Sequence, residues 1–126
     1  MSDVSRQFFP MQQIAYVPNH ARGDVSHADV EFGFVTSVKR TIMGQAIYCR
    51  YWSRNNQNEL RTKANSEAAD ADNIVPHVSH SDDDVVHAWM QYVPCRACGS
   101  QAWYESNAFV RCRNCGEIVM LHGETQ

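Results

Sequence analysis

Four of the five cysteines in this sequence form two Cys-x-x-Cys pairs, Cys95 with Cys98 and Cys112 with Cys115. Zn²⁺ binds four thiolates in a tetrahedron, and a Cys-x-x-Cys turn presents two sulfurs from one tight loop. The pairs repeat as Cys-Arg-x-Cys-Gly, and the closing glycine can adopt the positive φ that such a turn requires. This spacing predicts one structural Zn²⁺ with a closed ligand shell.

Other chemistry is less consistent with the same cysteines. A thioredoxin-like redox site expects one such motif within a βαβ pattern, which is absent, and a rubredoxin-like iron site usually has pairs much further apart. A catalytic zinc keeps one coordination position open, whereas four cysteines fill the shell. The net charge of a four-thiolate zinc site is negative, and Arg96, Arg111 and Arg113 are placed to moderate it.

The sequence around the cysteines indicates the elements that position them. Residues 103–111 (WYESNAFVR) predict a β-hairpin, and residues 117–121 (EIVML) predict a third strand. Over residues 92–122 the pattern resembles zinc ribbon domains, and this resemblance implies a structural zinc. We expect the ribbon unit to span residues 88–126.

A second group of metal-binding residue types lies in a polar loop: His20, Asp24, His27, Asp29 and Glu31. One interpretation is a second metal site, or a metal-dependent enzyme centred on His20, Asp24 and His27. The other is a loop whose side chains hydrogen-bond to their own backbone. Because the spacing does not fix these groups on one helix face, we expect the second interpretation to hold and the protein not to be an enzyme.

Residues 45–52 (QAIYCRYW) give the clearest strand pattern, with Tyr48, Arg50 and Trp52 on one face and Cys49 on the other. Aromatic rings beside basic groups can stack bases and contact phosphates. Alternatively, the aromatic side chains fill a core and the charges stay in solvent. The candidate contact residues for nucleic acid or a partner are Lys39, Arg40, Tyr48, Arg50, Trp52, Arg54, Arg111 and Arg113.

Short strands joined by polar loops predict a mainly β fold. Strands over residues 13–17, 32–38, 45–52 and 60–64, a helical turn after Ser66 and a last strand at 73–75 predict a small five-stranded barrel of the Src-homology, KOW or Tudor type. The barrel spans residues 13–76, after a flexible leader over 1–12. Residues 77–87 are expected to be an acidic linker without helical or strand period, and no long helix is expected.

The N-terminal part resembles a family of small uncharacterised tailed-phage proteins. Members share a Tyr-x-Pro-x-His-Ala-x-Gly-Asp-x-x-His-x-Asp-Val-Glu pattern before a Gly-Phe-Val-x-Ser-Val strand, and KANSEAADADNIVP resembles their closing segment. The matching residues are Tyr16, Pro18, His20, Ala21, Gly23, Asp24, His27, Asp29, Val30, Glu31 and Gly33. The resemblance covers residues 13–76 and implies a phage origin and a small barrel, but no activity.

Composition and charge exclude some classes of function but do not identify one. The chain is 44% hydrophobic and 20% charged, as in soluble proteins, and no apolar run is long enough to span a membrane. Unpaired cysteines without a secretory signal favour the cytoplasm, which would be the host cytoplasm for a phage protein. We therefore expect a non-catalytic protein that binds nucleic acid or a nucleic-acid-processing complex through its barrel and ribbon. The alternative is a factor that docks on and modulates a host enzyme; no small-molecule substrate is expected.

Overall fold

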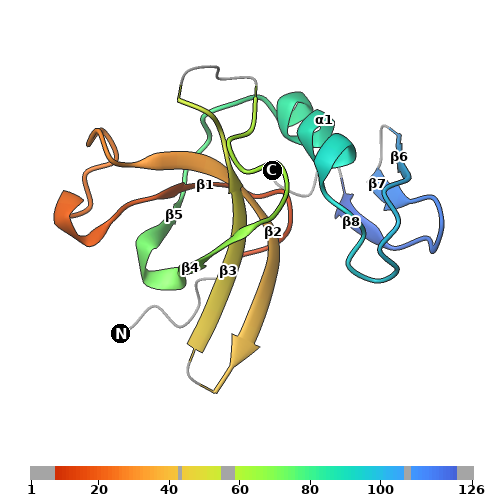
Figure 1. Cartoon of the computed structure of the whole chain (residues 1–126), viewed down its shortest axis with the longest axis horizontal. Helices are drawn as coiled ribbons and strands as arrows, with labels where there is room; N and C mark the ends of the chain where they lie inside the picture. The colour runs from red at the N-terminus through yellow and green to blue at the C-terminus, as the bar shows by residue number, and fades with distance from the viewer. Residues whose placement is uncertain (1–7, 43, 55–58, 107–108, 122–126) are drawn as a thin grey trace. The chain divides into compact units, whose positions relative to one another are not determined.

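The computed structural model describes residues 8–42, 44–54, 59–106 and 109–121. The chain divides into two compact units, Met1–Ser79 and His80–Gln126. Figure 1 shows that the described residues form two antiparallel sheets and one α-helix. The prediction of a mainly β protein is confirmed at this level. No helix in the described part of the chain is long and apolar enough to cross a membrane.

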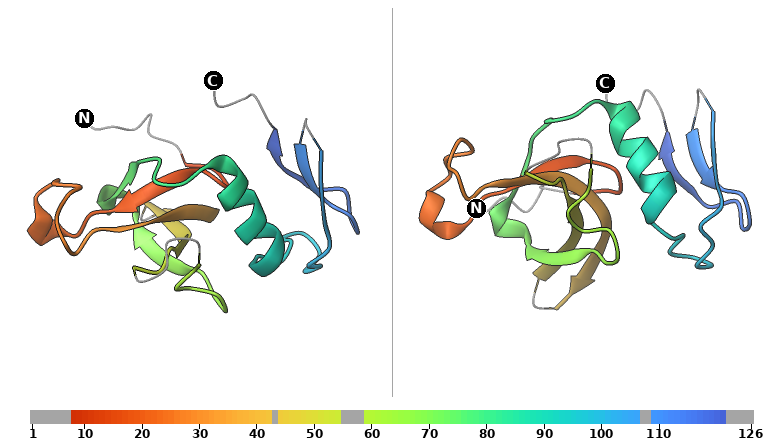
Figure 2. Two further views of the ribbon diagram at one scale, coloured as in Figure 1. Left: turned by 90° about the horizontal axis from the view of Figure 1, so that it is seen from above. Right: turned by 45° about the horizontal axis from the view of Figure 1, so that its top comes forward.

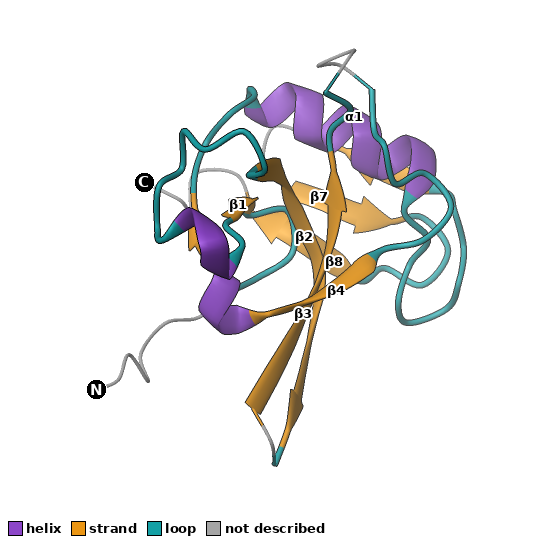
Figure 3. Ribbon diagram, turned by 60° about the vertical axis from the view of Figure 1, so that its left-hand side comes forward, coloured by secondary structure: helices purple, strands orange, loops and turns teal. Residues whose placement is uncertain are grey.

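The first unit contains a five-stranded antiparallel sheet with the strand order β4-β3-β2-β1-β5. Its elements are β1 (Gln13–Tyr16), η1 (Asn19–Ala21), β2 (Glu31–Thr41), β3 (Gly44–Tyr51), β4 (Glu67–Asp70), η2 (Ala71–Asn73) and β5 (Ile74–Pro76). β2 and β3 pair along most of their length and extend together beyond the other strands (Figure 3). The first three predicted strands and the last one are present with shifted ends.

Two predictions for this sheet need correction. No closed barrel is found among the described residues, because β4 and β5 are the two edges of the sheet and have no ladder between them. The predicted strand over residues 60–64 is also wrong: Leu60 makes one isolated bridge to Trp52, and the fourth strand begins at Glu67. The helical turn expected after Ser66 lies at Ala71–Asn73 instead, directly before β5.

The core of the sheet lies on the face predicted from the alternation in β3. Ile47, Cys49 and Tyr51 are buried there together with Ile14 of β1 and Val35 of β2. Burial of these β-branched and aromatic side chains is the main favourable term that holds the unit together. A register shift between Val35 and Ser37 bends β2 where it crosses this core.

Gly33 allows β2 and β3 to approach closely. It pairs with Tyr51, and a Cβ atom added at Gly33 would lie 2.1 Å from the backbone oxygen of Arg50. Any larger residue must therefore push the two central strands apart, since a backbone oxygen cannot rotate away.

We predict that Gly33→Ala destabilises the protein by about 1–3 kcal/mol, the usual cost of forcing an extra group into a packed core. Chemical denaturation measures the loss. Gly44→Ala is the matched control, because a Cβ at Gly44 meets no atom within 4 Å and only its φ of +130° opposes the change. An equal or larger loss in the control would show that close approach is not the cause.

The second unit begins with α1 (Asp82–Tyr92), so the expectation of no helical pattern over residues 77–87 is wrong. Ser81 caps the helix by accepting a hydrogen bond from the backbone N–H of Asp84 at 3.1 Å. The three aspartates of the first turn lie at the positive end of the helix dipole, where negative charge is stabilising. The helix dipole therefore offsets the repulsion among the three aspartates.

A three-stranded antiparallel sheet follows, with β6 (Trp103–Glu105), β7 (Phe109–Cys112) and β8 (Ile118–Leu121) in that order. These strands confirm the predicted hairpin and third strand. Trp103 anchors the sheet to α1: its ring lies edge-on to Trp89 at 5.9 Å, and its indole N–H donates to the carbonyl oxygen of Val93 at 2.8 Å.

Candidate metal centre

The four predicted ligands converge in the second unit. All four sulfur atoms of Cys95, Cys98, Cys112 and Cys115 lie within 4.8 Å of one another. The Sγ atoms of Cys95 and Cys115 are 3.6 Å apart, as are those of Cys98 and Cys112. These separations exclude disulfides, whose sulfurs lie about 2.05 Å apart. They match the edge of a tetrahedron with Zn–S bonds of about 2.3 Å, which is about 3.8 Å. The cluster can hold a metal ion and suits Zn²⁺.

The two Cys-x-x-Cys turns have the same backbone geometry. In the first turn, the backbone N–H of Cys95 donates to the carbonyl oxygen of Ser100 at 2.8 Å, and the N–H of Gly99 donates to the carbonyl oxygen of Cys95 at 2.7 Å. In the second turn, the N–H of Cys112 donates to the carbonyl oxygen of Glu117 at 2.8 Å, and the N–H of Gly116 donates to the carbonyl oxygen of Cys112 at 2.9 Å. Gly99 and Gly116 have φ of +79° and +84°, the left-handed conformation that glycine adopts without strain. The sequence repeat thus corresponds to a structural repeat.

Hydrogen bonds from N–H groups lower the pKa of Cys98 and Cys112, whereas the crowding of sulfur atoms raises the pKa of Cys115. The side-chain amide of Asn114 donates to Cys98 at 3.5 Å and, with the backbone N–H of Ser100, lowers the pKa of Cys98 to about 6. The N–H groups of Cys115 and Asn114 lower the pKa of Cys112. The N–H of Glu117 acts in the same direction on Cys115, but burial and the three neighbouring sulfur atoms raise its pKa to about 12. Four adjacent thiolates therefore need a cation.

The first sulfur of each pair is buried and the second is exposed. Cys112 is also the last residue of β7 and pairs with Trp103 of β6, so the cluster continues directly into the sheet. The adjoining N–H of Arg113 donates to the carbonyl of Ala102 at 2.8 Å. A bound metal would therefore fix both the turns and the hairpin register.

Cys49 is a buried residue of the first unit and belongs to the other core. Burial raises the pKa of its thiol to about 12. It behaves as a small apolar side chain, as its position on the inward face of the strand predicted.

Beside the metal centre, the outer face of the sheet carries an aromatic and arginine cluster. Tyr104 and Arg111 are cross-strand partners, and the Arg111 guanidinium lies 4.9 Å from the Tyr104 ring centroid. The Arg113 guanidinium lies 5.6 Å from the same centroid, and the Phe109 ring lies 6.3 Å from it. Tyr104 and Phe109 were not among the predicted contact residues. The alternation with buried Trp103 and Val110 was the available signal for their outward direction.

The predicted basic face of β3 is not an exposed surface. Arg50 is 3% exposed and Trp52 is 5% exposed. The Arg50 guanidinium donates to the backbone oxygens of Thr62 and Lys63, and its Nε donates to Ser66. Arg50 therefore has a structural role, because it donates hydrogen bonds to carbonyl oxygens of residues 62–63, which belong to no strand.

The remaining contact candidates in the first unit are scattered. Tyr48 is half-buried, and Arg54 donates to the carbonyl oxygens of Ala28 and Val30 in the loop between β1 and β2. Lys39 and Arg40 are exposed on the extended part of the β2–β3 hairpin, and Arg54 is exposed near the loop that it contacts.

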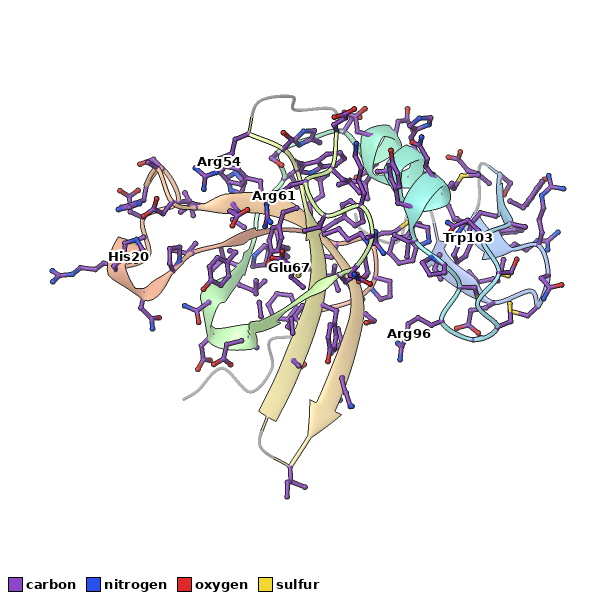
Figure 4. All side chains as sticks on the ribbon, viewed as in Figure 1. His20, Arg54, Arg61, Glu67, Arg96 and Trp103 are labelled. Carbon is purple, nitrogen blue, oxygen red and sulfur yellow. The ribbon has the colours of Figure 1, made fainter. Side chains whose placement is uncertain are left out.

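The loop between β1 and β2 brings together a different set from the one predicted. Nε2 of His20 lies 2.7 Å from a carboxylate oxygen of Asp29, and the N–H of Asp29 donates to Nδ1 of His27 at 3.0 Å. The hydrogen bond from His20 lowers the pKa of Asp29. Asp24 instead accepts from the N–H and hydroxyl of Ser26, as the self-bonded loop interpretation expected. Figure 4 shows His20 on this loop.

Glu31 lies outside that cluster. Its carboxylate pairs with Arg61, which also forms two hydrogen bonds with Glu67 of β4 (Figure 4). These ion pairs connect β2 and β4 at the surface, so the Glu31 carboxylate has a structural role.

Comparison with protein-family models, with curated proteins and with solved structures gives no match to this chain.

We predict that the cysteine centre of the purified protein binds one Zn²⁺ and that Cys112→Ser abolishes binding at this centre and unfolds the second unit. Structural zinc sites contribute on the order of 10 kcal/mol to folding, and their thiolates must be deprotonated, so zinc should also be released as the pH falls. Elemental analysis measures the bound zinc, and circular dichroism measures the folding of the second unit. Cys49→Ala is the control and should keep its zinc; loss of zinc in Cys49→Ala, or full folding of metal-free Cys112→Ser, contradicts the assignment.

We also predict that Arg50→Met lowers the free energy of unfolding by about 1–3 kcal/mol, because it removes the hydrogen bonds that the buried guanidinium donates to the backbone oxygens of Thr62 and Lys63. Denaturant titration measures the change, and Arg40→Met at an exposed position should stay within about 0.5 kcal/mol of wild type. Equal stability of the two variants would refute a structural role for Arg50.

Proposed function

We propose that the second unit is a zinc ribbon that binds single-stranded nucleic acid through its outer face. We call this surface the aromatic–arginine face and define it by Tyr104, Phe109, Arg111 and Arg113. The observation that carries the proposal is the exposed Tyr104 ring with two guanidinium groups within 6 Å of its centroid. The proposal does not depend on net charge, which is −3 for the chain.

The composition of this face matches the chemistry of an unpaired nucleotide. Bases stack on aromatic rings and on planar guanidinium groups, and guanidinium also pairs with phosphate oxygens. Tyr104 is 36% exposed although an aromatic ring of this size is costly to leave in water. Its neighbour in sequence, Trp103, fills the core of the unit instead.

The metal centre supplies rigidity to this face. Arg111 precedes Cys112 and Arg113 follows it, so both basic groups flank a metal ligand. The Nε of Arg113 also donates to the backbone oxygen of Trp103 at 3.2 Å. Holding the side chains in place before binding reduces the entropy that binding would otherwise cost.

The same site supports a non-catalytic role and a reducing environment. Four cysteines complete a tetrahedral shell and leave no position for a substrate or an activated water. Cysteines that remain thiolates are typical of the cytoplasm, where disulfides do not persist.

We predict that Tyr104→Ala weakens binding to a labelled single-stranded oligonucleotide by about 5- to 150-fold, since base–aromatic stacking contributes about 1–3 kcal/mol per base. Fluorescence anisotropy measures the affinity. Tyr104→Phe is the matched control and should bind within a few-fold of wild type, because it retains the stacking surface. Both variants should keep the zinc of the cysteine centre.

The salt dependence provides a separate test. Each phosphate contact adds about 0.7 to the slope of log affinity against log salt concentration for single strands. Arg111→Ala should therefore lower that slope by about 0.7. Absence of binding by the wild-type protein at low salt, or equal affinities of wild type and Tyr104→Ala, would refute the proposal and leave docking on a host protein as the better hypothesis.

A further inference from the structure

The loop between β1 and β2 holds three metal-binding side chains that neither the cysteine centre nor the aromatic–arginine face uses. The ligand atoms of His20, His27 and Asp29 all lie within 4.8 Å of one another. The two imidazole rings meet edge to face with centroids 5.2 Å apart. The His20 and Asp29 side chains are 62% and 59% exposed, so an ion can reach them from solvent.

Consecutive turns give this loop a defined backbone. Three backbone hydrogen bonds, each spanning three residues, link Ala21 to Asp24, Asp24 to His27 and His27 to Val30. Figure 2 shows the loop at one end of the sheet, in orange. His20 lies in the preceding Pro18–Ala21 turn, so both histidines belong to one segment of hydrogen-bonded turns.

The first unit also anchors the loop at both ends. The Asn73 side chain donates to the Val17 carbonyl oxygen at 3.0 Å, and Arg54 donates to the Val30 carbonyl oxygen at 3.3 Å. Val17, Ala21 and Val30 are buried together with Ala15 of β1. Such anchoring keeps the three ligands close before any ion binds, which lowers the entropic cost of coordination.

We propose that His20, His27 and Asp29 form a second metal site, for a divalent transition-metal ion such as Zn²⁺. Two imidazoles and one carboxylate suit zinc, iron or nickel, whereas magnesium and calcium prefer shells made only of oxygen ligands. Three protein ligands leave at least one position for water or an anion, unlike the closed cysteine shell. The proposal is independent of nucleic-acid binding.

Coordination would replace hydrogen bonds that now hold the cluster. A proton joins Nε2 of His20 to the Asp29 carboxylate at 2.7 Å, and the ion would take its place between the same two atoms. The Nδ1 atom of His27 now accepts a hydrogen bond from the N–H of Asp29. If Nδ1 bound the metal, this hydrogen bond would be lost. His20 would then carry its ring proton on Nδ1, because a neutral imidazole binds a metal through its unprotonated nitrogen.

The structure also separates the proposed ligands from the neighbouring carboxylate. One Asp24 oxygen accepts from the N–H of Ser26 at 2.9 Å and from its hydroxyl at 2.7 Å. Asp24 is therefore a turn residue, although the second-site interpretation of the sequence grouped it with His20 and His27.

The test counts Zn²⁺ per chain in the full-length protein after dialysis against micromolar zinc. Wild type should bind two ions, and His20→Ala and Asp29→Asn should each bind one, with the cysteine site still filled. Asp24→Asn is the matched control and should retain both ions. Zinc titration followed by imidazole NMR signals should shift His20 and His27, at about one equivalent beyond the cysteine site.

The outcomes separate this proposal from the one above. One ion in wild type, two ions in His20→Ala, or loss of the second ion in Asp24→Asn with His20 and His27 signals unmoved would each overturn the second site. None of these results affects the cysteine centre, because its occupancy is read separately from the thiolate absorption of the cobalt-substituted protein.

Discussion

Repulsion among four sulfur atoms is the constraint on which the second unit depends. Thiolates held within 4.8 Å of one another are unstable without a cation, yet their turns, backbone hydrogen bonds and strand pairings all bring them together. The described residues of the unit form three short strands and one helix, which bury little apolar surface. A bound metal would convert this repulsion into a strong link, and the Trp89–Trp103 pair adds an apolar contact.

The sequence was informative about the fold where local chemistry and spacing decide the result. The repeated glycine-ended turns, the hairpin over residues 103–111 and the inward face of β3 follow from alternation and from the conformational freedom of glycine. Closure of the first sheet was not predictable in this way, because it depends on whether the two edge strands, β4 and β5, pair with each other. Helix α1 was missed for another reason: three aspartates repel one another in isolation, but a serine cap and the helix dipole reverse the balance.

The sequence identified some residues of the candidate sites and missed others, again because it shows local spacing but not tertiary packing. The cysteine ligands were identifiable because both members of a pair come from one tight turn. For Arg50 and Trp52 the sequence left a contact surface and a packed core as alternatives, because alternation separates the two faces of a strand but cannot tell that both faces are buried. In the polar loop, Asp24 and Asp29 are chemically equivalent in the sequence. Only the turns of the folded backbone direct one toward Ser26 and the other toward His20.

The burial of Cys49 bears on how the metal centre is assembled. In an unfolded chain it would be a fifth soft ligand, able to capture zinc or to form mixed disulfides with any of the other four cysteines. Inside the first unit its thiol stays protonated and out of reach of solvent. Because this unit precedes the other cysteines in the chain, it can fold first during synthesis and withdraw the competing sulfur. The cysteines that emerge later then have only one combination of partners.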